Sequence, residues 1–153
     1  TFCLPRNMRT KRKAKEESLQ ISISKYLRLQ YPNAIFTAEG SGLKLTKGQA
    51  VKASKQRSSR GLPDLWIDEP RGMYHGLRIE LKREGDSPFR KDGKGLKKKI
   101  VRKPDGTTFD HIAEQAEIIA RLQSKGYYAC FSVGFDQTKK IIDEYMKLKP
   151  SPQ

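Results

Sequence analysis

Cysteine is scarce in this chain, which has only Cys3 and Cys130 among its 153 residues. Two thiols so far apart in the sequence form neither a disulfide framework nor a recognisable zinc-binding spacing. Cys130 belongs to an apolar run at residues 128–131, where a buried free thiol is the expected state. Stabilisation by disulfides or structural zinc is therefore not expected.

Long apolar segments are also missing. No stretch approaches the roughly 20 apolar residues that span a bilayer. No apolar segment follows the positive charges near the N-terminus, as a secretory signal would require. We therefore expect an intracellular, soluble protein without a membrane partner. Hydrophobic residues make up 35% of the chain, which is enough for the modest core of one domain.

Acidic residues are few relative to basic ones, since 17 Asp and Glu accompany 32 Lys and Arg, for a net charge of +15. Such an excess favours polyanionic partners, because contacts with phosphates release condensed counterions. No basic helix with a wide aromatic face stands out, so we expect nucleic acid rather than an anionic membrane. Charge alone does not distinguish an enzyme from a non-catalytic binding module.

Apolar periodicity predicts an α/β protein. Alternation of apolar and polar residues indicates strands, and apolar residues at three- and four-residue steps indicate helices. In chain order we expect a helix at 16–30, strands at 34–37, 62–67 and 76–82, a helix at 110–125, a strand at 127–133 and a helix at 137–147. This order implies helices packed on a central mixed sheet.

The remaining segments are basic and polar. Residues 1–15 are expected to form a basic N-terminal arm, which either becomes ordered on phosphates or remains a solvated tail. Residues 16–148 then form one domain, and residues 83–109 form a basic hairpin or loop inserted into it. One short helix is possible around residues 50–51.

Asp64, Glu80 and Lys82 form the pattern with the clearest chemical meaning. In a strand, Glu80 and Lys82 point to the same side, while Leu81 points to the core. If Asp64 lies at a matching level on the adjacent strand, two carboxylates converge beside an ammonium group. Such a pair attracts a hard divalent cation, which activates water for attack on a phosphodiester. Taken alone, a Glu-x-Lys pattern is more typical of an exposed ion pair.

These residues resemble the signature of the PD-(D/E)XK nucleases, and more closely that of the VRR-NUC family, which includes small stand-alone phage and bacterial members. The four matching pieces are EESLQ at 16–20, RGLPD at 60–64, ELK at 80–82, and Gln115 followed by Leu122 and Gly126-Tyr127. The resemblance spans about residues 16 to 146. It implies a restriction-endonuclease-like αβββαβ core with a central mixed sheet flanked by helices.

The resemblance also implies roles for individual residues. Asp64 and Glu80 would be metal ligands together with the backbone carbonyl of Leu81, and Lys82 would be the catalytic lysine. Glu16 would be the acidic residue of the first helix, as a further catalytic residue and metal ligand, and Gln115 would match the family's helix glutamine. Glu17 competes with Glu16, but Glu16 lies four residues before Gln20 on the apolar face. The cofactor would be Mg²⁺ or Mn²⁺, with no small-molecule cofactor.

Basic residues near these positions are candidates for DNA binding. They fall into a group in the polar stretch before Asp64 and a group in the inserted hairpin: Lys44, Lys47, Lys52, Lys55, Arg57 and Arg60, and Lys97, Lys98, Lys99, Arg102 and Lys103. The second group would grip a second duplex arm or form a solvated loop. His111 would contact a phosphate, a metal-bound water, or only solvent.

The sequence therefore favours a metal-dependent DNA endonuclease that uses a metal-activated water. By resemblance, it would be selective for branched or junction DNA and would act as a homodimer. Two alternatives remain, a nuclease that nicks or trims ends with the same residues, and a basic nucleic-acid-binding module without activity.

Overall fold

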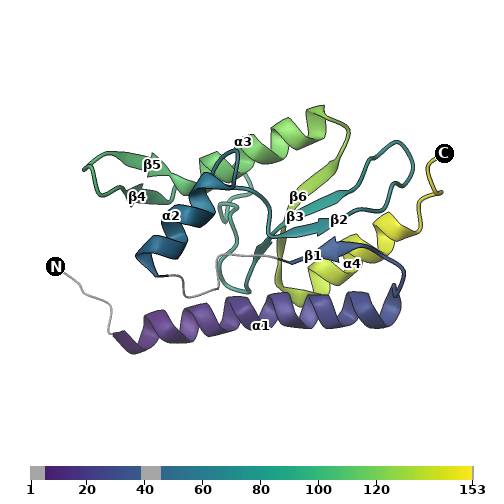
Figure 1. Cartoon of the computed structure of the whole chain (residues 1–153), viewed down its shortest axis with the longest axis horizontal. Helices are drawn as coiled ribbons and strands as arrows, with labels where there is room; N and C mark the ends of the chain where they lie inside the picture. Colours follow the sequence, from purple (N-terminus) through teal and green to yellow (C-terminus); the bar gives the residue numbers. More distant parts are fainter. Residues whose placement is uncertain (1–5, 39–45, 153) are drawn as a thin grey trace.

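The computed structural model describes residues 6–38 and 46–152, with side chains from residue 17 onward. Figure 1 shows a long helix along one side of a central sheet and a second helix on the opposite side. In chain order the elements are α1 (Arg6–Gln30), β1 (Phe36–Thr37), α2 (Lys47–Lys55), β2 (Leu65–Ile67), β3 (Leu77–Lys82), β4 (Ile100–Arg102), β5 (Thr108–Asp110), α3 (His111–Ser124), β6 (Tyr128–Val133) and α4 (Gly134–Met146).

The central sheet has four strands in the order β1-β2-β3-β6. β1 and β2 are antiparallel, β2 and β3 form an antiparallel hairpin, and β3 and β6 are parallel. β4 and β5 form a separate antiparallel hairpin. The predicted α/β class with a mixed sheet is confirmed, and α1, β1, β2, β3, α3 and β6 follow the αβββαβ order. The short helix that the sequence allowed around residues 50–51 is present as α2, and the insertion, which was expected to be a hairpin or a loop, contains the β4–β5 hairpin.

The core lies between one face of the sheet and the helices α1 and α4. Ile23 and Leu27 of α1 and Ile142 of α4 are fully buried and belong to one cluster with Leu77 and Ile79 of β3. Burying side chains of this size contributes about 1.5–3 kcal/mol each. α3 covers the other face of the sheet, where it packs against β3 and β6. The charged residues of β3 therefore lie under α3 and outside the main core.

The first helix is longer than expected. α1 begins at Arg6, so most of the segment expected to be a basic arm is helical. The prediction weighed the positive charge of this segment and overlooked its composition. Residues 6–16 contain neither Gly nor Pro and are rich in Arg and Lys, which have high helix propensities.

The other boundaries agree more closely. Asp110 was expected to cap the helix after the inserted hairpin, and its side chain accepts hydrogen bonds from the N–H groups of Ile112 and Ala113. β2 starts at Leu65, later than predicted, because residues 61–64 have no strand pairing. Within the described ranges, none of the helices combines the length and apolar character needed to cross a bilayer.

Candidate active site

The alternation of β3 determines which side chains reach the site. Leu77, Ile79 and Leu81 are buried in the core. Glu80 and Lys82 lie on the opposite face, where they contact α3 through Gln115. The predicted arrangement of Glu80 and Lys82 on one side and Leu81 on the other is confirmed.

Asp64 lies directly before β2, and the hairpin register brings it to Glu80. Leu65 of β2 pairs with Ile79 of β3, so Asp64 and Glu80 are at the same level. The Oδ2 atom of Asp64 accepts a hydrogen bond from the Leu81 N–H at 3.1 Å. This contact holds the carboxylate beside β3, as the sequence pattern predicted.

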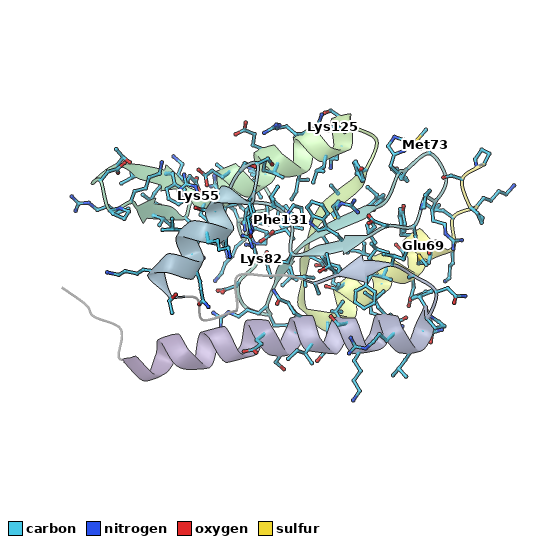
Figure 2. The ribbon with its side chains drawn as sticks, viewed as in Figure 1. Lys55, Glu69, Met73, Lys82, Lys125 and Phe131 are labelled. Atoms are coloured by element: carbon cyan, nitrogen blue, oxygen red, sulfur yellow. The ribbon has the colours of Figure 1, made fainter. Side chains whose placement is uncertain are left out.

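Gln115 joins the two charged residues of β3. Its Oε1 atom accepts a hydrogen bond from the Lys82 Nζ at 2.8 Å, and its Nε2 atom donates one to Glu80 Oε1. Lys82 Nζ also lies 3.3 Å from Glu80 Oε1. Figure 2 places Lys82 in the middle of the molecule near Phe131, whose ring centroid is 5.9 Å from Nζ. Gln115 is only 4% exposed, so this network is largely shielded from water.

The electrostatics of Glu80 are unfavourable for an isolated carboxylate. Burial, followed by the negative charge of Asp64, raises the pKa of Glu80 well above its usual range, although the positive charge of Lys82 opposes this shift. The Oε2 atom of Glu80 is buried and accepts no hydrogen bond from the residues that the structure describes. A buried carboxylate oxygen without a donor is costly. A hard divalent cation at Asp64 and Glu80 would relieve both the repulsion and this deficit, so the residues fit such a group.

Asp64, Glu80, Lys82 and Gln115 line a cleft of about 330 Å³. The walls of the cleft are mainly basic and polar. They include Arg83, Asp86, Lys97, Lys98, Lys99 and His111. Sequence reasoning did not anticipate that Lys97, Lys98 and Lys99 lie at the acidic pair. These lysines are held there because the Lys99 N–H donates to the Asp110 cap of α3, a contact for which the sequence gives no signal.

His111 also lines this cleft, at the start of α3. Burial lowers the pKa of His111, and the positive charges of Lys82 and Lys99 lower it further. The imidazole is therefore biased toward its neutral form. It lines the cleft together with Gln115 and Lys99, and a contact of His111 with a phosphate or a metal-bound water stays a prediction.

Glu16 is the acidic residue predicted for the first helix. The side chain of Glu16 lies outside the described residues, so its role remains a prediction. Gln20, four residues later, lines the cleft, whereas Glu17 is exposed. Among the side chains that the structure describes, no third His, Cys, Asp or Glu joins Asp64 and Glu80 in a metal-holding group.

The other basic candidates that the structure describes are not part of the cleft lining. Lys47, Lys52 and Lys55 are exposed on α2, and Arg57 and Arg60 are exposed in the segment after it. Figure 2 shows Lys55 on α2, to one side of Lys82. On the inserted hairpin, Arg102 is exposed and Lys103 is half-buried, while Lys44 lies outside the described residues.

A comparison with known structures agrees with the overall fold. A solved structure described as "VRR_NUC domain protein" is 26% identical to the chain, with a TM-score of 0.59, and the match covers 89% of this chain and 91% of that one. This similarity supports a VRR-NUC nuclease domain. No family model matches the sequence, and no curated protein matches it. The match covers nearly all of both chains, so the similarity extends over the fold as a whole.

Proposed function

We propose that the chain is a Mg²⁺- or Mn²⁺-dependent nuclease of the PD-(D/E)XK superfamily that hydrolyses phosphodiester bonds in DNA. Within this proposal it is an endonuclease selective for branched or junction DNA, and a homodimer would supply two sites for paired cuts. The observation that supports the activity most directly is the meeting of Asp64 and Glu80 beside Lys82 in a basic cleft. The similarity to a VRR_NUC domain protein supports it independently.

The cation would be held by the carboxylates of Asp64 and Glu80, with the backbone carbonyl of Leu81 and the carboxylate of Glu16 as further ligands. A bound cation of this type polarises a phosphodiester oxygen and lowers the pKa of water. The Oε2 atom of Glu80, buried and without a donor in the described part of the chain, is the feature that best fits such a cation.

The other residues of the site act on the charge of the substrate. Lys82 donates to Glu80 and Gln115, and a third hydrogen of its ammonium group is left for a phosphate oxygen or the attacking water. A charge fixed in this way stabilises the negative charge that develops during hydrolysis. Gln115 keeps Glu80 and Lys82 in position, and Lys97, Lys98 and Lys99 neutralise phosphates at the cleft walls.

The sharpest test replaces Glu80 by Gln, which keeps the size of the side chain and removes its charge. The parent should cleave labelled DNA in Mn²⁺, and the Glu80→Gln variant should be slower by roughly a hundredfold or more. The substrates are matched duplex, flap, fork and four-way junction DNA. Faster cleavage of the branched forms would support the proposed selectivity for branched DNA, and equal cleavage rates would contradict it.

A matched control is Glu117→Gln, which removes an exposed carboxylate from α3 two residues after Gln115. It should cleave like the parent. Mn²⁺ should raise the Tm of the parent and of this control, because ligands of the native state stabilise it, and it should not raise the Tm of Glu80→Gln. Unchanged cleavage by Glu80→Gln would contradict the assignment.

A further inference from the structure

Phe109 on β5 lies outside the hydrophobic core. It pairs with Val101 in the β4–β5 hairpin, is half-buried, and is not part of the core cluster around β3. A two-stranded hairpin has little core of its own. The packing of the domain therefore gives no clear reason for a large aromatic ring at this position.

The groups that cover Phe109 are cationic. The Arg60 guanidinium carbon lies 4.1 Å from the centre of the ring, and Lys103 Nζ lies 5.5 Å from it. Arg60 also pairs with Glu114 at 3.1 Å, but half of its side chain remains exposed. Exposed cation–π contacts stabilise a fold by only about 0.5–1 kcal/mol. Two cations at one ring repel each other, and this repulsion is relieved when a polyanion binds.

This group, which we call the Phe109–Arg60 stack, adjoins the cleft. The His111 ring meets Phe109 edge-on, with centroids 6.3 Å apart and an interplanar angle of 75°. His111 itself lines the cleft together with Lys99 and Gln115. His111, Phe109 and Arg60 thus connect the lining of the cleft with the β4–β5 hairpin. Figure 1 shows this hairpin beside α2 at one end of the molecule.

The geometry points to a binding site for an unpaired nucleotide of DNA at the Phe109–Arg60 stack, next to the cleft that the proposed function assigns to phosphodiester hydrolysis. An unpaired base stacks on aromatic rings and on guanidinium planes, irrespective of its identity. Arg60 and Lys103 would neutralise the phosphates on either side of this base. In a continuous duplex each base is stacked on its neighbours, so the site favours DNA with an unpaired segment beside the cleavage position.

Binding without metal tests this site separately from catalysis. Fluorescence anisotropy in EDTA compares a blunt duplex with the same duplex extended by about ten unpaired thymidines, a length within the range of single-strand site sizes. The parent should bind the extended form about tenfold more tightly, since stacking one base is worth about this much. Phe109→Leu should lose this preference and keep its affinity for the blunt duplex. Phe109→Tyr, which retains the ring, should keep the preference.

Arg60→Lys provides a second variant, because it keeps the positive charge and removes the guanidinium plane, and it too should lose most of the preference. The matched control is Tyr128→Leu, which removes an exposed aromatic residue at the start of β6, beyond the far end of α3. It should bind like the parent. The proposal is overturned if the parent shows no preference, or if Phe109→Leu and Arg60→Lys both retain it.

The two proposals can fail independently. If Glu80→Gln cleaves normally, the nuclease site is wrong, while a preference lost in Phe109→Leu still establishes the nucleotide site. If Glu80→Gln is inactive and the preference survives in Phe109→Leu, only the nucleotide site is wrong.

Discussion

Arg78 and Glu80 occupy equivalent positions on the same face of β3, and their surroundings differ. The Arg78 guanidinium lies between the rings of Trp66 and Tyr127 at 4.6 and 4.5 Å and pairs with Asp68. Glu80 is equally buried, and among the described residues each of the two has one side-chain atom without a hydrogen bond, Oε2 of Glu80 and Nε of Arg78. Glu80, however, lies beside the like charge of Asp64. Arg78 is thus held by stacking and ion pairing as part of the fold. The pKa of Glu80 is raised by its burial, which is typical of a residue kept for function.

Gly61 acts on the same site through the backbone. It has a positive φ of 77°, and a Cβ atom at this position would lie 3.3 Å from backbone atoms of Glu114 and Gln115. The segment that leads to Asp64 therefore packs directly on α3, beside the glutamine that holds Glu80. A side chain here would push these two parts of the site away from each other.

We expect Gly61→Ala to lower the free energy of unfolding by about 1–3 kcal/mol, because alanine is strained at positive φ and crowds α3. Cleavage should fall further than the loss of folded protein explains. Urea unfolding measures the change in stability, and the rate of DNA cleavage is measured at temperatures below the unfolding transition.

Gly48→Ala is the matched control. Gly48 lies in the helical backbone of α2, where a Cβ atom would have no atom of the other described segments within 4 Å. This variant should be stabilised by about 0.5–1 kcal/mol, the usual gain of Ala over Gly in a helix. Equal stability of the two variants would show that the backbone at Gly61 is not constrained.

At the scale of elements, α3 connects the fold to the site. Its N-cap, Asp110, accepts hydrogen bonds from Ile112 and Ala113 in the first turn and from the N–H of Lys99 in the preceding loop. One carboxylate therefore starts the helix that carries Gln115 and holds the basic wall of the cleft.

Replacing Asp110 should destabilise both the first turn of α3 and the attachment of Lys99 to it. We expect Asp110→Ala to lower the Tm and weaken DNA binding, and Asp110→Asn to keep most of the parent's Tm, since Asn is also a good N-cap. Calorimetry and anisotropy are the measurements. Equal Tm values for the parent and Asp110→Ala would show that the cap is dispensable.

The same residue predicts a pH dependence. The hydrogen bond from Lys99, with those from Ala113 and Ile112, lowers the pKa of Asp110. Since the pKa is lower in the folded state, the stabilisation is complete above the unfolded value of about 4 and disappears as the pH falls through the folded value. The difference in Tm between the parent and Asp110→Asn should therefore shrink below about pH 4.

At the scale of the whole molecule, the net charge of +15 comes from lysines at the cleft and from lysines elsewhere on the surface. Lys97, Lys98 and Lys99 line the cleft, whereas Lys125, Lys147 and Lys149 are exposed elsewhere. Figure 2 shows Lys125 at the edge of the molecule, away from Lys82. Long-range attraction depends on total charge, and contacts with phosphates depend on position.

Two triple Lys→Gln variants with the same net charge separate these effects. Neutralising 97, 98 and 99 should reduce the slope of log K against log salt by about one for each phosphate that the protein no longer neutralises. Neutralising 125, 147 and 149 should change the slope much less. The slopes are measured by fluorescence anisotropy from low to moderate salt. Identical slopes for the two variants would show that the cleft lysines do not contact DNA phosphates.

Much of the fold was predictable because its signals are local. The two-residue repeat of 76–82 identified β3 and the orientation of Glu80 and Lys82, and Asp110 was recognisable as an N-cap. The start of α1 at Arg6 was missed because charge was weighed above helix propensity. A resemblance of short motifs, rather than periodicity, indicated Gln115 as a site residue.

The sequence by itself determined the order of helices and strands, the positive charge, and the side of β3 on which Glu80 and Lys82 lie, since these follow from composition and from the geometry of neighbouring residues. Only the tertiary structure decided that Gln115 bridges this pair, that Lys99 is tied to the cleft, and that Arg60 stacks on Phe109. These contacts join residues far apart in the chain. They depend on how α3 and the hairpin pack against the sheet, which no local pattern specifies.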